Sequence, residues 1–136
     1  MSASKYDFQI EQGSSFRMSL IYKDSDANPI DLANYCARIT WKTNTNKSQV
    51  FTTENSDFSL YKFYIESPTT DGKLTLLLPA STTNSFNFTS AKYDLELQNK
   101  SSELYTGGGA ETFRILYGNI SLVKRYSKGT DLLDCD

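Results

Sequence analysis

Residues 16–23, Phe-Arg-Met-Ser-Leu-Ile-Tyr-Lys, place an apolar side chain at every second position: Phe16, Met18, Leu20 and Tyr22. Successive side chains of a β-strand point to opposite faces of its sheet, so this alternation predicts a strand with one face in a core. The segment 24–29 that follows reads Asp-Ser-Asp-Ala-Asn-Pro. Asp, Asn and Ser favour turns through hydrogen bonds to the backbone, and proline fixes φ. The chain is therefore expected to reverse direction here.

A second strand is predicted over residues 35–42, where Ala37, Ile39 and Trp41 alternate with polar side chains. The turn before it predicts that the two strands pair with each other. The single tryptophan is expected at the inner end of the second strand. Residues 43–57 are mostly Thr, Asn, Ser, Lys and Gln, which predicts a surface excursion with one short edge strand.

The rest of the chain continues as short strands separated by turns. Strands are expected within residues 58–66, 73–78, 91–99 and 113–122. Leucines at alternate positions of residues 73–78, with Thr75 and Leu77 between them, favour a strand that is covered on both faces. Gly118 interrupts the last strand and predicts a bulge or a bend. Pro79 and the Ser and Thr residues after it favour a short helical turn near residues 79–86.

This series of about 6–8 strands is typical of an all-β, antiparallel two-sheet sandwich. A length of 136 residues fits one domain. That domain is expected over residues 1–123, with an N-terminal lead-in before Phe16. Residues 124–136 leave the alternation and are predicted to form a C-terminal arm.

Charge, hydropathy and cysteine content narrow the classes of partner. The formal net charge is -2, so the chain lacks the basic field that supports nucleic-acid binding. No stretch approaches the roughly 20 apolar residues of a membrane helix, and the start does not resemble a signal peptide. Neither nucleic acid nor membrane is expected as a partner. Cys36 and Cys135 are predicted to be reduced thiols, with a bridge between them as the alternative.

Catalytic chemistry is not expected either. The sequence contains no histidine, the commonest general base and transition-metal ligand. Asp94 and Glu96 point the same way along a strand, away from its apolar side chains, which favours a solvated outer face over a glycosidase pair. The acidic run at 24–31 begins like a calcium loop but lacks its glycine and glutamate, which favours turn chemistry. We therefore predict no enzyme, no catalytic residue, no cofactor and no metal ligand.

One set of residues near the start of the chain resembles a known family. The set is Gln12, Gly13, Phe16, Asp24, Pro29, Asp31, Leu32, Tyr35 and Arg38. It resembles the opening of small immunoglobulin-like virion proteins of tailed phages, including the amino-terminal module of phage upper-baseplate proteins and short structural proteins of cyanobacterial and marine phages. The resemblance continues more weakly through residues 72–76, 93–97 and 114–122. It implies an immunoglobulin-like sandwich and a place in a virion, and it implies no active site.

From this resemblance we expect a non-enzymatic structural component of a tailed-phage virion, in the tail, neck or baseplate, assembled in the host cytoplasm. Its expected partners are other virion proteins and copies of itself. A capsid-surface decoration protein is one alternative, and a carbohydrate-binding host-attachment module that uses exposed tyrosines is another. The residues before Phe16 and the arm after Lys124 are the expected inter-subunit arms. The candidate interface residues are Tyr105, Lys124, Arg125, Tyr126, Leu132 and Leu133.

Overall fold

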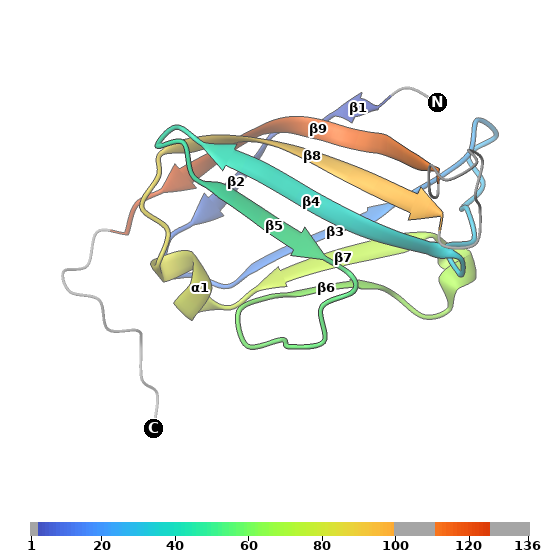
Figure 1. The fold of residues 1–136 in the computed structure, drawn as a ribbon, viewed down its shortest axis with the longest axis horizontal. Coiled ribbons are helices and arrows are strands. Elements are labelled where there is room, and N and C mark those ends of the chain that lie inside the picture. Colours follow the sequence, from blue (N-terminus) through green and yellow to red (C-terminus); the bar gives the residue numbers. More distant parts are fainter. Residues whose placement is uncertain (1–2, 100–110, 126–136) are drawn as a thin grey trace.

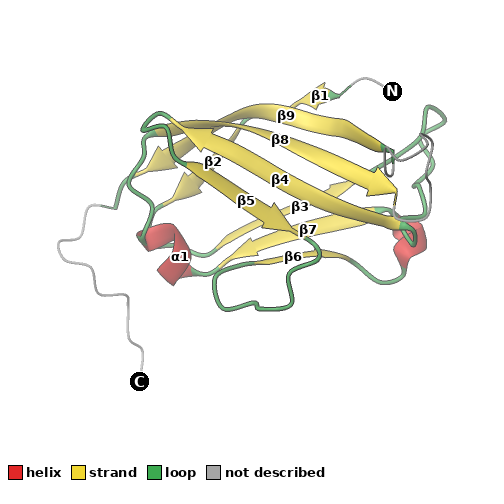
Figure 2. Ribbon diagram, in the orientation of Figure 1, coloured by secondary structure: helices red, strands yellow, loops and turns green. Residues whose placement is uncertain are grey.

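The computed structural model describes residues 3–99 and 111–125, which form two stacked β-sheets (Figure 1). The larger sheet contains β1 (Ser4–Lys5), β2 (Phe8–Glu11), β9 (Thr112–Val123), β8 (Ser90–Asn99), β4 (Tyr35–Thr43) and β5 (Ser48–Thr52). The smaller sheet contains β3 (Phe16–Ile21), β7 (Lys73–Leu78) and β6 (Lys62–Ile65). Two short helical segments connect strands, the 3-10 turn Thr69–Asp71 and α1 (Ala80–Asn84) (Figure 2).

The strand order is that of an immunoglobulin-like sandwich. The sheet β9-β8-β4-β5 faces the sheet β3-β7-β6, and β1 and β2 run parallel to the outer edge of β9. Two sheets packed face to face, with connections that cross between them, are the arrangement of this fold. The predicted all-β, immunoglobulin-like class is confirmed, and so is the short helical turn near residues 79–86. The described strands number nine, because the N-terminal lead-in contributes β1 and β2.

The predicted pairing of the first two long strands is wrong. β3 pairs with β7, whereas β4 pairs with β8 and β5 in the other sheet. The turn does reverse the chain, as an antiparallel bridge between Lys23 and Pro29. The chain then crosses to the second sheet through Leu32, which is buried. Two strands that both have one apolar face can pair within one sheet or face each other across a core, and a local turn signal does not distinguish these outcomes.

The core lies between the sheets and includes Trp41 of β4. Its indole ring is fully buried and lies 4.7 Å from the ring of Phe51, 5.9 Å from Phe86 and 6.4 Å from Phe88, measured between centroids. Phe51 belongs to β5, the edge strand expected within residues 43–57. On the central strand β7, Thr75 is buried on the outer face together with the inward leucines, whereas Lys73 and Leu77 are only half-buried, so the predicted cover of both faces holds only in part.

Gly118 has a different structural role from the predicted bulge or bend. The register shift in the pairing of β8 with β9 lies between Leu95 and Glu96, while Gly118 pairs regularly with Tyr93. A Cβ atom on Gly118 would lie 2.1 Å from the carbonyl oxygen of Tyr6. Glycine therefore allows the N-terminal backbone to approach β9 closely.

Candidate interaction surface

On the outer face of the larger sheet, charged side chains of neighbouring strands lie opposite one another. Three rows cross β4, β8 and β9: Arg38, Glu96 and Arg114; Thr40, Asp94 and Tyr117; and Lys42, Lys92 and Asn119. Lys5 of β1 adjoins Tyr117 and extends the middle row. Among the described strand residues, five cations thus share this face with two carboxylates, and the carboxylate of Asp7 bonds Asn119 at its edge. The whole chain, by contrast, has a net charge of -2. We call this surface the cationic face.

The cationic face contains an open groove of about 430 Å³. Lys5, Lys42, Lys92 and Arg114 line it together with Asp94. Burial raises the pKa of the Asp94 carboxyl, and the nearby Glu96 raises it further, against the opposing influence of Arg114 and Arg38. Four cationic side chains and one carboxyl group therefore line this groove.

Two of the cations are held by neighbours on the sheet. Arg38 donates a hydrogen bond of 2.8 Å to Glu96, and this ion pair raises the pKa of the guanidinium. Arg114 lies over the ring of Tyr117, 4.8 Å from its centroid. By contrast, Lys42 and Lys92 form no ion pair within the described ranges, and they stand directly opposite each other. Their charges face solvent and are available to an anionic partner.

The clustering of Lys5, Lys42, Lys92 and Arg114 is a feature that sequence reasoning missed. Each of these cations could be assigned to an outward position of its own strand. Their convergence depends on the pairing of β4 with β8 and of β8 with β9, which connects residues about 50 positions apart or about 25 apart. The outward position predicted for Asp94 and Glu96 is confirmed by the strand register.

The family-motif residues Gln12 and Gly13 bind the end of β9 to α1. Gln12 donates from Nε2 to the carbonyl of Phe86 at 2.7 Å, and its Oε1 accepts the backbone N–H of Arg125 at 3.1 Å. The backbone N–H of Gly13 donates to Thr83 Oγ1 at 3.1 Å, and Gly13 adopts a φ of 83°. This cluster fixes the position of Arg125, the last described residue.

Three further motif residues shape the connection after β3. The carboxylate of Asp24 accepts the backbone N–H groups of Asp26 and Asn28, at 2.9 and 3.0 Å, and Pro29 closes the bridge with Lys23. Asp31 accepts the backbone N–H of Ala33 at 3.0 Å. These bonds are the turn chemistry that the sequence predicted. Among the described residues, no group of three or more Asp, Glu, Cys or His could hold a metal ion.

The other motif residues pack the sandwich, with one exception. Phe16 stacks on Phe8 with 5.4 Å between ring centroids, Leu32 is buried, and Tyr35 meets Phe113 edge to face at 6.2 Å. Arg38 is the exception, because it lies on the cationic face. The motif therefore contributes mainly to the scaffold.

The predicted interface residues are only partly within the described ranges. Lys124 is exposed and Arg125 is half-buried, with its Nη1 donating to Asn84 Oδ1 at 2.7 Å. Tyr105, Tyr126, Leu132 and Leu133 lie outside the described residues. Cys135 does too, so neither the predicted reduced thiols nor the alternative bridge to the half-buried Cys36 is tested. The N-terminal residues 4–5 and 8–11 are strands of the larger sheet in this domain, so this part of the lead-in is not an arm.

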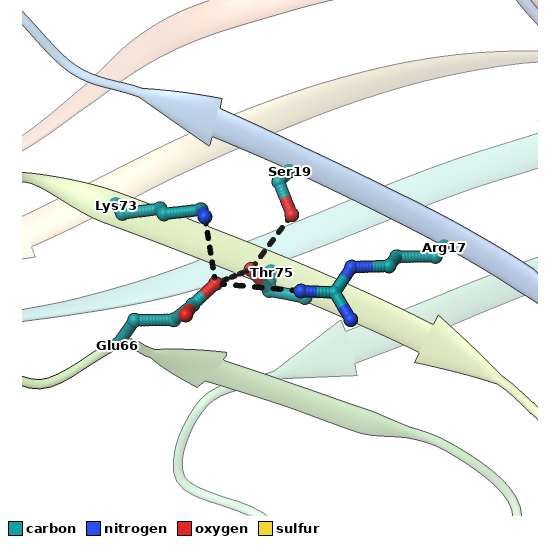
Figure 3. A network of polar contacts seen from close by, with 5 residues as sticks. All are labelled: Arg17, Ser19, Glu66, Lys73 and Thr75. Atoms are coloured by element: carbon teal, nitrogen blue, oxygen red, sulfur yellow. Dashed lines mark hydrogen bonds and ion pairs between the residues drawn. The ribbon is translucent and has the colours of Figure 1, made fainter.

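A polar network covers the middle of the smaller sheet (Figure 3). Glu66 accepts a short hydrogen bond from Thr75, whose hydroxyl lies 2.9 Å from that of Ser19. Lys73 and Arg17 reach the same carboxylate, at 3.6 and 4.0 Å. The Thr75 hydrogen bond, with smaller contributions from Lys73 and Arg17, lowers the pKa of Glu66. The hydroxyl of Thr75 on the outer face of β7 is therefore hydrogen-bonded.

Comparison with known proteins identifies no family. No family model matches the chain, and no curated protein matches it. Among solved structures, it is similar to a crystal structure of ICOS in complex with ICOS-L and an anti-ICOS-L VNAR domain, at 15% identity and a TM-score of 0.44. The alignment covers 90% of this chain and 56% of that chain, little more than half its length. No described helix is long and apolar enough to cross a membrane.

Proposed function

We propose that this chain is a non-enzymatic structural component of a tailed-phage virion, located in the tail, neck or baseplate. It docks the cationic face against an acidic surface of a neighbouring virion protein. The virion setting is supported by the resemblance of the motif from Gln12 to Arg38. In this fold the motif residues hold a turn, the core and the exit of the chain, which suits a scaffold that presents a surface.

The docking role is carried by one observation, the opposition of Lys42 and Lys92 across β4 and β8. Like charges directly opposite each other destabilise a sheet. The pair therefore lowers the stability of the isolated domain, and carboxylates of a partner would relieve the repulsion. Complementary charge also steers encounter and fixes the register of two docked surfaces.

Charge reversal on the cationic face tests this function. A phage that carries Lys42→Glu and Lys92→Glu is compared with one that carries Lys23→Glu and Lys47→Glu, which changes the net charge equally at exposed positions outside the groove. The measurement is the copy number of the chain per purified particle by quantitative mass spectrometry. We expect the first variant to be depleted from particles and the second to be retained. Equal incorporation of both variants would overturn the docking role.

A further inference from the structure

A second groove, of about 380 Å³, lies on the outer face of the smaller sheet beside α1. Phe58, Leu77 and Pro79 supply apolar surface, and Arg17 and Lys62 supply positive charge. Half of the Phe58 surface is exposed, as is 65% of the neighbouring Leu60. Exposed apolar surface bordered by charge is typical of a site that binds a peptide or protein. We call it the apolar groove.

Strand register sets the order of groups across the apolar groove. Arg17 of β3 pairs with Leu77 of β7, and Leu77 pairs with Lys62 of β6. Neighbouring strands are about 4.8 Å apart, so the backbones of the two cations are separated by about 10 Å with a leucine between them. The Nζ atom of Lys62 lies 5.2 Å from the ring centroid of Phe58. The groove thus presents a cation, an apolar floor and a second cation.

The last described residue, Arg125, is anchored to a helix next to this groove. Arg125 is bonded through its backbone to Gln12 and through its guanidinium to Asn84, the last residue of α1. Pro79, which lines the groove, immediately precedes the same helix. A helix of this length spans about 7 Å. The guanidinium of Arg125 therefore lies about one short helix away from Pro79.

The sequence beyond that point contains a complementary segment. Residues 131–134 read Asp-Leu-Leu-Asp, an apolar pair between two carboxylates. In an extended chain, residues as far apart as Asp131 and Asp134 have Cα atoms about 10 Å apart, which matches the separation of the backbones of Arg17 and Lys62. Asp131 comes six residues after Arg125, and six extended residues reach about 20 Å. The segment can therefore reach the groove of its own chain.

We propose that the apolar groove binds residues 131–134 of the same chain. Because consecutive side chains of an extended chain alternate, one leucine of the pair covers Leu77 and Phe58, and the two carboxylates at its ends lie beside Arg17 and Lys62. The short tether holds the segment at an effective concentration of about millimolar, which favours the same chain over a neighbouring copy in dilute solution. This contact would cover the apolar groove before any partner binds, and it does not depend on the virion assignment.

Paramagnetic relaxation in the full chain tests the contact. Cys135 follows the segment directly, so a nitroxide attached to it in a Cys36→Ser background reports which amides lie near. In dilute ¹⁵N-labelled protein we expect loss of amide intensity at Arg17, Leu77 and Lys62. The loss should disappear when Leu132→Asp and Leu133→Asp are introduced. Intensities at the groove that are unaffected by the nitroxide would overturn the proposal.

One control tests the charge pairing, and another tests whether the bound segment belongs to the same chain or to a second copy. Arg17→Glu with Lys62→Glu should abolish the intensity loss, and adding Asp131→Lys with Asp134→Lys should restore it, whereas Lys23→Glu with Lys47→Glu should leave it unchanged. Failure of the restoration would refute the charge pairing.

A mixture of ¹⁵N-labelled protein without nitroxide and unlabelled protein with nitroxide detects contact between copies. Groove broadening of equal size in that mixture would assign the segment to a second copy and contradict the proposal.

Discussion

Lys42 of β4 and Lys92 of β8 stand directly opposite each other on the outer face of the larger sheet. The adjoining rows differ, because Arg38 faces Glu96 and Thr40 faces Asp94. The like-charged pair is thus a local departure from the charge pairing of the sheet. Under the proposed docking role, folding and binding would make opposite demands on these two lysines.

Lys92→Glu is expected to stabilise the isolated domain, because it replaces a cross-strand repulsion with an attraction. The expected gain in the free energy of unfolding is about 0.2–1 kcal/mol, measured by urea denaturation. Lys23→Glu serves as the control and should change the free energy of unfolding by less than about 0.5 kcal/mol. A loss of stability in Lys92→Glu would show that the lysine pair is not repulsive.

Gln12→Ala should destabilise the domain, because it removes the bonds to the Phe86 carbonyl and the Arg125 N–H. Each such bond contributes about 0.5–1.5 kcal/mol, so a loss of about 1–3 kcal/mol is expected in chemical denaturation. Gln9, which is exposed on β2, provides the matched Gln9→Ala control. Equal effects of the two substitutions would mean that the Gln12 cluster does not hold the end of β9.

Gly118→Ala should displace the N-terminal strands from β9. The added methyl group would lie 2.1 Å from the Tyr6 oxygen and 2.7 Å from the Tyr6 carbonyl carbon, and backbone atoms cannot rotate away. We expect a loss of about 1–3 kcal/mol in the free energy of unfolding. Hydrogen exchange should accelerate at the amides of β1 and β2 first. Ser121→Ala, at an exposed position of β9, should leave that exchange unchanged.

Glu66→Gln tests the polar network on the smaller sheet through its pH dependence. The Thr75 hydrogen bond and the nearby Lys73 and Arg17 lower the folded-state pKa of Glu66 below its unfolded value. The ionised carboxylate therefore adds stability above the unfolded pKa, and this stability is lost as the pH falls through the folded pKa. The variant should be less stable than the wild type at about pH 7, and the difference should shrink toward about pH 3. A difference that is constant with pH would contradict the assigned network.

Features set by neighbouring residues were predictable from the sequence. The alternation around Met18, Ile39 and Trp41 identified inward side chains correctly, because strand periodicity is a local property. The turn at residues 24–29 and the helical turn after Pro79 were also found, since both depend on short-range hydrogen bonds and proline geometry. These features were sufficient for the fold class.

Features set by contacts distant in the sequence were not predictable. The placement of β3 and β4 in different sheets depends on a crossover that the turn residues do not encode. Lys42 and Lys92 meet only after the register of β4 and β8 is fixed. The role of Gly118 depends on Tyr6, which is more than 100 residues away in the sequence. The cationic face was therefore not predictable from the sequence, although each of its long strands was predicted.

The measurement that tests the central claim most directly is the position of this chain in intact particles. Purified virions are separated into heads and tails, each fraction is analysed by mass spectrometry, and the fraction that contains the chain is examined by cryo-electron microscopy. The proposed function predicts the chain in the tail fraction, with the cationic face against an acidic neighbour. Recovery with heads would support capsid decoration instead. Absence from both fractions would contradict a structural role in the virion.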